Sequence, residues 1–175
     1  LRTKAIEDWR ALHEGDSTVV LVGTATCGRS AGSLAVLDTF TRETRERGLD
    51  CNILEVGCIG MCYAEPIVCI LKPGNPGICY GNVDANIASE LLEGYIVGDD
   101  PMAQYALGSY GEGVIEGIPV LFETPVLKPQ VRRALKNCGF INPSEIDHYL
   151  ANGGYAGLEK ALHGGAEFVL EEVKA

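Results

Sequence analysis

The sequence predicts an α/β domain with a small, mostly helical segment after it. Residues 18–56 read as a buried strand, an amphipathic helix and a second strand, an order that implies a parallel pair with a right-handed crossover. A turn with two prolines and two glycines at 72–77 separates two further strands and implies a hairpin. At 98–101 the regular patterning stops, and this change marks the boundary between the domain and the C-terminal residues.

Each element of the expected domain has its own signal. Apolar residues at helical spacing mark the helices, and short apolar runs bounded by glycine or proline mark the strands. Gly48 stands where a left-handed residue would end the second helix. In chain order we expect a helix at 3–14, strands at 18–22 and 51–56 with a helix at 30–47 between them, strands at 67–71 and 78–80, and a last helix at 83–95.

The remaining residues are expected to have little core of their own. Residues 102–127 lack sustained periodicity, and their prolines favour an extended path over a surface. The apolar run at 119–122 predicts a stretch that docks in a groove of a partner. Glycine pairs punctuate the rest of the chain, where we expect short helices near 129–137, 144–151 and 155–162 and a fourth from about 166 onward.

The composition excludes several classes of function. The 175 residues carry 14 Lys and Arg against 24 Asp and Glu, which gives a formal net charge of −10. Nucleic acid is a poor partner for such a chain because phosphate binding depends on Lys and Arg. No run approaches the about 18 apolar residues that a membrane span requires. We therefore expect a globular protein with no nucleic acid partner and no membrane span.

The seven cysteines point to thiol chemistry rather than to a disulfide framework. An odd number cannot pair completely within one chain. A chain of which 46% is hydrophobic also has enough apolar material for a core without disulfides. These features predict a cytoplasmic protein that uses some of its thiols for metal or redox chemistry.

Three cysteines are expected to converge at one edge of the sheet. Cys27 follows the first strand and Cys58 follows the second, and the ends of parallel strands meet at the same edge. Cys62 lies four residues after Cys58, in a loop whose glycines permit tight turns. Thiolates on glycine-rich loops suit an iron–sulfur cluster, and zinc could also use three cysteines with a fourth ligand.

The other cysteines and the histidines do not meet this geometric test. Cys51 begins the second strand, roughly 20 Å from Cys58 in an extended chain, so it lies at the opposite edge. We expect the remaining thiols to be ordinary buried side chains, namely Cys69, Cys79 and Cys138. The histidines fall on or at the ends of expected helices, where packing or solvent exposure explains them, namely His13, His148 and His163.

At these residues the chain resembles a known family. Residues 23–28 (GTATCG), 57–62 (GCIGMC) and 65–68 (EPIV) are similar to the thioredoxin-like 2Fe–2S ferredoxin domain. They look most like the version at the N-terminus of NADH-binding flavoprotein subunits related to complex I NADH dehydrogenase, as found in NAD(P)-reducing and electron-bifurcating hydrogenases. The later segment is similar to the region after that domain in those subunits, with matches at 128–139, 146–150, 153–155 and 158–162.

The resemblance implies an electron-transfer module in an NAD(P)H-dependent oxidoreductase complex, with a 2Fe–2S cluster on Cys27, Cys58 and Cys62. It implies a ferredoxin domain at 1–97, an extended linker or docking stretch at 98–127, and short helices at 128–175 that lead into an absent flavin- and NADH-binding domain. This chain has no glycine-rich loop to hold a phosphate, so FMN and NAD(P) belong to the parent protein or a partner. The partners would be that flavin- and NADH-binding domain or subunit and other iron–sulfur subunits, and no residue of this chain is assigned a catalytic role.

Two departures from the family pattern leave alternatives open. The fourth cysteine would fall a few residues before Cys27, at 21–23, where this chain has Leu-Val-Gly. The remaining ligand could be an oxygen of Thr24 or Thr26, a residue of a partner, or absent, and an oxygen ligand or an open position should make the cluster labile. A cluster-less structural docking domain is therefore the rival interpretation.

A dithiol redox protein of thioredoxin type is a weaker interpretation, since Cys-x-x-Cys is missing at the helix start. The resemblance to thioredoxin-like folds also predicts a cis peptide bond between Glu65 and Pro66.

Overall fold

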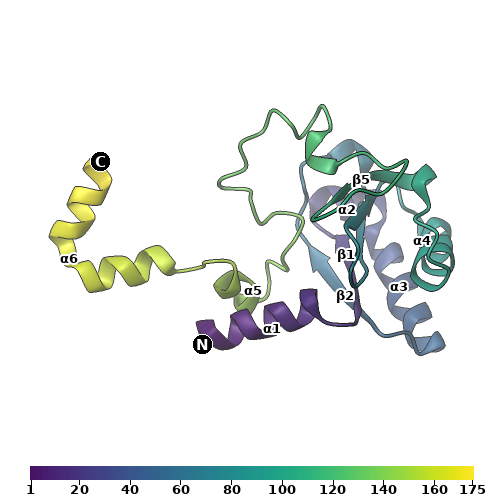
Figure 1. The fold of residues 1–175 in the computed structure, drawn as a ribbon, viewed down its shortest axis with the longest axis horizontal. Helices are drawn as coiled ribbons and strands as arrows, with labels where there is room; N and C mark the ends of the chain where they lie inside the picture. Colours follow the sequence, from purple (N-terminus) through teal and green to yellow (C-terminus); the bar gives the residue numbers. More distant parts are fainter.

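A five-stranded sheet organises the computed structural model, which describes residues 1–175 (Figure 1). The strands lie in the order β2-β1-β3-β4-β5, and this mixed sheet with its covering helices confirms the expected α/β class. The strands are β1 (Thr18–Gly23), β2 (Cys51–Val56), β3 (Val68–Leu71), β4 (Gly77–Tyr80) and β5 (Ala106–Tyr110). The α-helices are α1 (Arg2–Glu14), α2 (Thr26–Ala31), α3 (Ser33–Arg47), α4 (Ala85–Leu91), α5 (Ile146–Ala151) and α6 (Ala156–Lys174).

The central strands pair as the sequence predicts. β1 and β2 run parallel, in register from Thr18 opposite Cys51 to Gly23 opposite Val56, so their carboxyl ends lie side by side. β3 and β4 return antiparallel as a hairpin. The peptide bond before Pro66 is cis, as expected, and it precedes β3 at the edge where β1 and β2 end.

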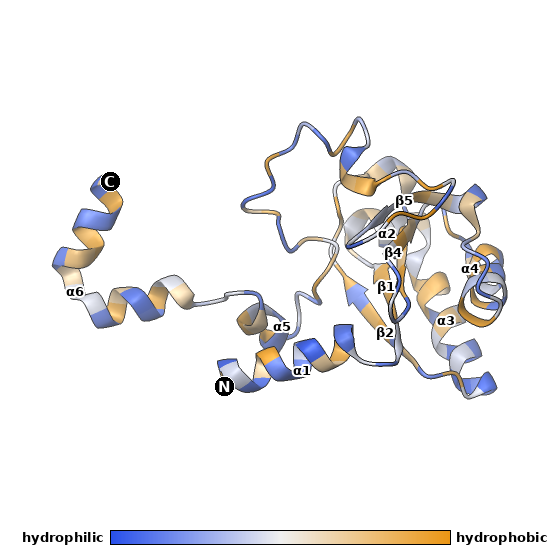
Figure 2. Cartoon of the chain, in the orientation of Figure 1, coloured by the Kyte–Doolittle hydropathy of each residue, from blue (hydrophilic) through white to orange (hydrophobic).

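Two apolar cores lie on the two faces of the sheet. The first gathers Phe40 of α3, Leu91 of α4 and Tyr80 of β4 around the strands, all three fully buried. The second contains Leu21, Ile59 and Leu121 and lies on the opposite face. Apolar residues are correspondingly gathered on the strands in Figure 2. The long α3 ends at Gly48, which has a φ of 63° and donates its backbone N–H to Arg45, as its position predicts.

The stretch expected to be a linker instead contributes a strand to the sheet. β5 pairs antiparallel with β4, and Ser109 of β5 also forms an isolated parallel β-bridge with Val120. Leu121 is completely buried, and its backbone packs closely on Gly108. A Cβ atom on Gly108 would lie only 2.7 Å from the Leu121 Cα. Leu121 therefore completes this chain's own core, whereas Pro119 and Val120 are exposed, and the docking of the run at 119–122 in a partner stays a prediction.

The helices after residue 128 also differ from expectation. Residues 129–137 form turns rather than a helix. α5 packs on α1, with Trp9 in edge contact with the His148 ring. α6 extends away from the domain and is broken at Gly165, whose φ is 76° (Figure 1). The two helices expected on either side of 163–165 are the two halves of α6. No helix of the chain is both long enough and apolar enough to cross a membrane.

The burial of Leu121 can be tested by mutation. Leu121→Ala should lower the free energy of unfolding by about 2–5 kcal/mol, because it removes a fully buried side chain and leaves a cavity. Val120→Ala is the matched control, since Val120 is 40% exposed and should cost less than about 1 kcal/mol. Urea unfolding of both variants measures the difference, and equal costs would contradict this packing of Leu121.

Candidate metal centre

Three thiols come together at the edge where β1 and β2 end. Cys27 lies in the first turn of α2, shortly after β1. Cys58 follows β2 by two residues, and Cys62 opens a short 3₁₀ turn that leads to Pro66. The parallel register of β1 and β2 is what brings these three segments together.

The spacing of these sulfurs is suitable for a metal centre. The Cys58 and Cys62 Sγ atoms are 3.7 Å apart. Two thiolates on one tetrahedral centre, at a metal–sulfur distance of about 2.3 Å, would lie about 3.8 Å apart. The Cys27 thiol lies close enough to the Cys62 thiol for the latter to raise the pKa of Cys27. No group of three His, Cys, Asp or Glu side chains is arranged around a single ion in this structure.

The loop between Cys58 and Cys62 directs a backbone donor at sulfur. Gly60 has a φ of 103°, a conformation that L side chains rarely adopt. This turn lets the Gly60 N–H donate a hydrogen bond to the Cys58 Sγ over 3.3 Å. Ile59 and Met61 on either side of Gly60 are buried in the second core, so the loop is anchored on both sides of this donor.

Glu65 brings a buried carboxylate to the same edge, a feature that the sequence did not indicate as part of the site. Its residue is 7% exposed, and Oε2 accepts a hydrogen bond of 2.9 Å from the Ile67 N–H. The carboxylate also lies close enough to the Cys58 thiol to raise the pKa of that thiol. The only sequence signal was an acidic residue directly before the proline that opens an apolar strand.

The low polarity around these groups disfavours thiolate formation in the metal-free protein. Burial raises the pKa of Cys58 to about 12, with the Glu65 and Cys62 groups adding to the increase and the Gly60 N–H opposing it. The pKa of Cys27 is raised chiefly by its contact with the Cys62 thiol. A bound cation would reverse this balance, because metal coordination deprotonates thiols.

The threonines suggested as oxygen ligands lie elsewhere in this loop. Thr24 is buried, its N–H bonds to the Val56 carbonyl, and its own carbonyl accepts from the Arg29 side chain. Thr26 begins α2 with an exposed side chain. Neither hydroxyl forms a hydrogen bond with the three thiols, whereas the Glu65 carboxylate lies close enough to Cys58 to raise the pKa of that thiol.

The C-terminal segment holds the cysteine loop from outside. Arg132 donates to the Ile59 carbonyl over 2.6 Å and, through its other terminal nitrogen, to the carbonyls of Leu135 and Cys138. Gly139 packs against Ile59 so closely that a side chain would lie 3.0 Å from the Ile59 Cβ. Residues 132–139 thus form a latch over the turn between Cys58 and Cys62.

Comparisons with known proteins place this chain among hydrogenase subunits, although no family model matches it. It is 32% identical to the NADP-reducing hydrogenase subunit HndB of Solidesulfovibrio fructosivorans over 127 residues, which cover 72% of this chain and 90% of HndB. The chain belongs to the HndB family. This confirms the resemblance to NADP-reducing hydrogenase subunits that the motifs indicated.

Two shorter matches accompany the HndB match. Over 39 residues, 22% of this chain, it is 54% identical to the NADP-reducing hydrogenase subunit HndC of the same organism, but these cover only 8% of HndC. A 2Fe–2S ferredoxin of Clostridium pasteurianum is 33% identical over 69 residues, which are 38% of this chain and 65% of that ferredoxin.

Solved structures of a thioredoxin-like 2Fe–2S ferredoxin from Aquifex aeolicus also match the chain. One has 18% identity and a TM-score of 0.47, covering 58% of this chain and all of that one. Another has 19% identity and a TM-score of 0.46, covering 54% and 99% of the two chains.

The remaining cysteines of this HndB family member lie apart from the three thiols. Cys51 pairs with Thr18 at the far end of β2, as expected from the strand length. Cys69 and Cys79 are buried in the second core as expected, but the expectation that they are free thiols is wrong. They stand opposite each other on β3 and β4, and a disulfide joins them. Cys138 is half-buried in the latch.

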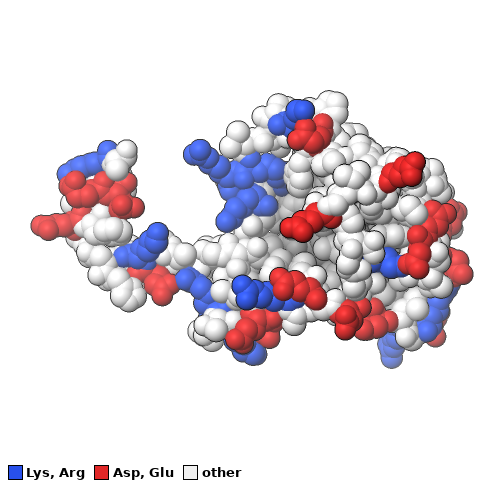
Figure 3. Space-filling view, viewed as in Figure 1, with Lys and Arg blue, Asp and Glu red and all other residues white.

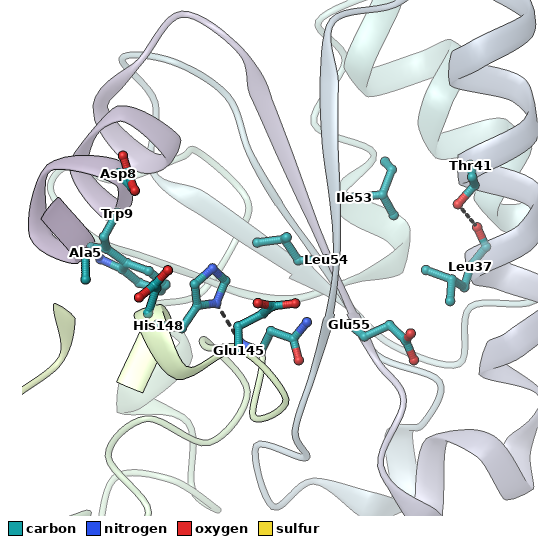
Figure 4. Close-up of a pocket in the computed structure, with 12 residues that line it drawn as sticks. Ala5, Asp8, Trp9, Leu37, Thr41, Ile53, Leu54, Glu55, Glu145 and His148 are labelled. Carbon is teal, nitrogen blue, oxygen red and sulfur yellow. Dashed lines mark hydrogen bonds between the residues drawn. The ribbon is translucent and has the colours of Figure 1, made fainter. Parts of the chain in front are cut away.

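One cavity of the HndB-type chain is lined by residues that include none of the thiols. Its volume is about 560 Å³, and it opens between α1, α5 and β2 (Figure 4). His148 accepts a hydrogen bond from the Asn142 N–H, and His13 stacks on Trp9. Burial lowers the pKa of both histidines. Their packing agrees with the expectation that they are structural, and His163 lies on α6, far along the chain from this cavity.

The raised pKa of Cys58 can be tested by alkylation of the metal-free protein. At about pH 8, an increase from 9.0 to about 12 leaves roughly a thousand-fold less thiolate, so iodoacetamide should label Cys58 far more slowly in the folded chain than in guanidinium. Peptide mapping by mass spectrometry measures each rate. Similar rates in the folded and unfolded chain would contradict the burial of this thiol.

Proposed function

We propose that this chain is the iron–sulfur electron-transfer module of an NADP-reducing hydrogenase complex, with a 2Fe–2S cluster held by Cys27, Cys58 and Cys62. The observation that supports it most directly is the meeting of these three thiols at one sheet edge in a member of a hydrogenase subunit family. The donor set fits the cluster, because soft thiolates suit iron–sulfur centres.

When bound, the cluster would accept and release one electron at a time. It would thereby connect a flavin that is reduced by two electrons to carriers that accept one. The chain's own groups set the surroundings of that charge. The Gly60 N–H donates to the Cys58 sulfur and stabilises negative charge there. Ile59 and Met61 exclude water from the inner side of the loop, whereas Cys62 is exposed and faces the outside.

The surface beside Cys62 is suited to a partner with acidic groups. The latch and the residues before it carry exposed Lys128, Arg133 and Lys136 in a chain of net charge −10. Lys and Arg gather at this part of the surface in Figure 3. Val131 and Leu135, which are 80% and 55% exposed, add apolar area among these charges. We place the electron partner here, in a multi-subunit complex.

The other parts of the complex supply the groups that this chain lacks. We assign FMN and NAD(P) to a flavin- and NADH-binding partner, and the next electron carrier to another iron–sulfur subunit. Figure 1 shows α6 extending from the domain, with Leu162, Phe168 and Leu170 among its exposed apolar residues, and we expect this helix to be covered in the assembly. The cytoplasm is the compartment that suits such a complex.

Serine substitutions test the cluster assignment. Cys27→Ser, Cys58→Ser and Cys62→Ser should each abolish or strongly reduce iron and sulfide after anaerobic reconstitution, because serine replaces a soft sulfur by a hard oxygen. Cys51→Ser is the matched control and should load like the wild type, since Cys51 lies at the far end of β2. Iron and sulfide analysis, with EPR spectra of the reduced protein, measures the result.

The outcome separates the electron-transfer function from its rival. Loss of the cluster in Cys51→Ser would contradict the assignment of the ligands. A wild-type protein that takes up no iron under anaerobic conditions would favour a docking domain without a cluster.

A further inference from the structure

We propose that Glu65 is the fourth protein ligand of the cluster and binds iron through its carboxylate. This inference rests on the proposed function and identifies the ligand that the missing cysteine would have supplied. It is carried by three observations about one side chain: its burial, its lack of a cationic partner, and the space that two glycines leave for it.

The Glu65 carboxylate is buried, and no cationic side chain compensates its negative charge. The residue is 7% exposed, its carboxylate accepts a hydrogen bond from the Ile67 N–H, and the Cys58 thiol lies close by. No Lys, Arg or His forms an ion pair with it, and the nearby Arg29 is instead paired with Glu55. Burial of an ionised carboxylate is costly unless it is paired or coordinates a metal. A positively charged iron centre would provide that compensation.

The carboxylate lies next to Gly23, within the 21–23 stretch where the family pattern has its fourth cysteine. A Cβ atom built on Gly23, the last residue of β1, would lie 3.0 Å from Glu65 Oε2 and 3.5 Å from Oε1. A Cβ on Gly28, directly after Cys27, would lie 3.3 Å from Oε2. The two glycines therefore leave room for the carboxylate next to Cys27, where a side chain on β1 would otherwise project.

The surrounding backbone fixes the carboxylate in this place. The Asn82 and Val83 N–H groups hold the turn at Glu65 by donating backbone hydrogen bonds to the carbonyls of Ala64 and Pro66. The Ile67 N–H then binds Oε2. Each carboxylate oxygen has more than one lone pair, so accepting from Ile67 leaves acceptor capacity for iron.

The charge balance is also suitable. On cluster binding the three thiols release their protons, and the carboxylate binds as an anion, forming one iron–oxygen bond. Three thiolates and one carboxylate carry the same total charge as four thiolates. A carboxylate therefore replaces the missing cysteine without the change in charge that a neutral histidine ligand would bring. Oxygen is a harder donor than sulfur, so this bond should be the weakest of the four.

Glu65→Gln tests the proposal with a side chain of the same shape that can still accept from Ile67. After anaerobic reconstitution we expect about ten-fold faster loss of iron to a chelator, together with changed visible and EPR spectra, because a neutral amide is a poorer ligand. Glu55→Gln is the matched control: it removes a carboxylate at the end of β2 that is paired with Arg29 and does not contact the thiols. It should leave both readouts unchanged.

A second variant moves the ligand back to β1. Glu65→Ala alone should load poorly, and Gly23→Cys combined with Glu65→Ala should restore stable loading, because the new sulfur would occupy the volume that the carboxylate vacates. The spectra of this double variant should differ from those of the wild type, as expected when an oxygen ligand is replaced by sulfur. Thermal unfolding followed by circular dichroism confirms that each variant is folded.

The results separate this proposal from the one on which it rests. If the wild type binds a cluster and Glu65→Gln matches it in spectra and in the rate of iron loss, Glu65 is not a ligand and only this inference fails. Poor loading of a folded Gly23→Cys, Glu65→Ala variant would also overturn it. If the wild type itself binds no iron, the proposed function fails first.

Discussion

The parallel pairing of β1 with β2 is the constraint on which the candidate centre depends. It aligns Gly23 with Val56, so the two loops that carry Cys27 and Cys58 leave the sheet from adjacent positions. A shift of the register by one residue would turn every side chain of the strand to the other face and would also displace these loops relative to each other. The two apolar cores on the faces of the sheet hold the register, because every residue of β1 is buried.

Much of this arrangement could be predicted from local sequence, because the responsible signals are short-range. The strand–helix–strand order and the cap at Gly48 depend on residues near in sequence, whereas the cis bond before Pro66 was expected from the resemblance to thioredoxin-like folds. The convergence of the three cysteines is then a consequence of topology alone. Cys51 was excluded by strand length, and the pairing with Thr18 agrees.

The features that sequence could not predict depend on contacts between distant segments. β5 contains Ala106, Gly108 and Ser109, which have little preference for strands, and it forms because β4 offers an unpaired edge. Residues 129–137 form turns, in which the Arg132 side chain reaches the distant Ile59 carbonyl as well as the carbonyls of Leu135 and Cys138. Glu65 has the sequence signature of an ordinary charged residue beside a proline, and only the folded chain brings its carboxylate to Gly23.

The latch formed by residues 132–139 gives the protein a mechanical connection that a ferredoxin domain ending at residue 97 would lack. Arg132 ties the turn around Ile59 to a surface that carries exposed cations and apolar side chains. A subunit that binds this surface would therefore change the conformation of the loop that carries Cys58 and Cys62. Linkage between two sites is reciprocal. If binding of the subunit changes the free energy of reduction at the thiols, then reduction changes the binding free energy of the subunit by the same amount. The affinity for the neighbouring subunit would then depend on whether the centre has accepted an electron.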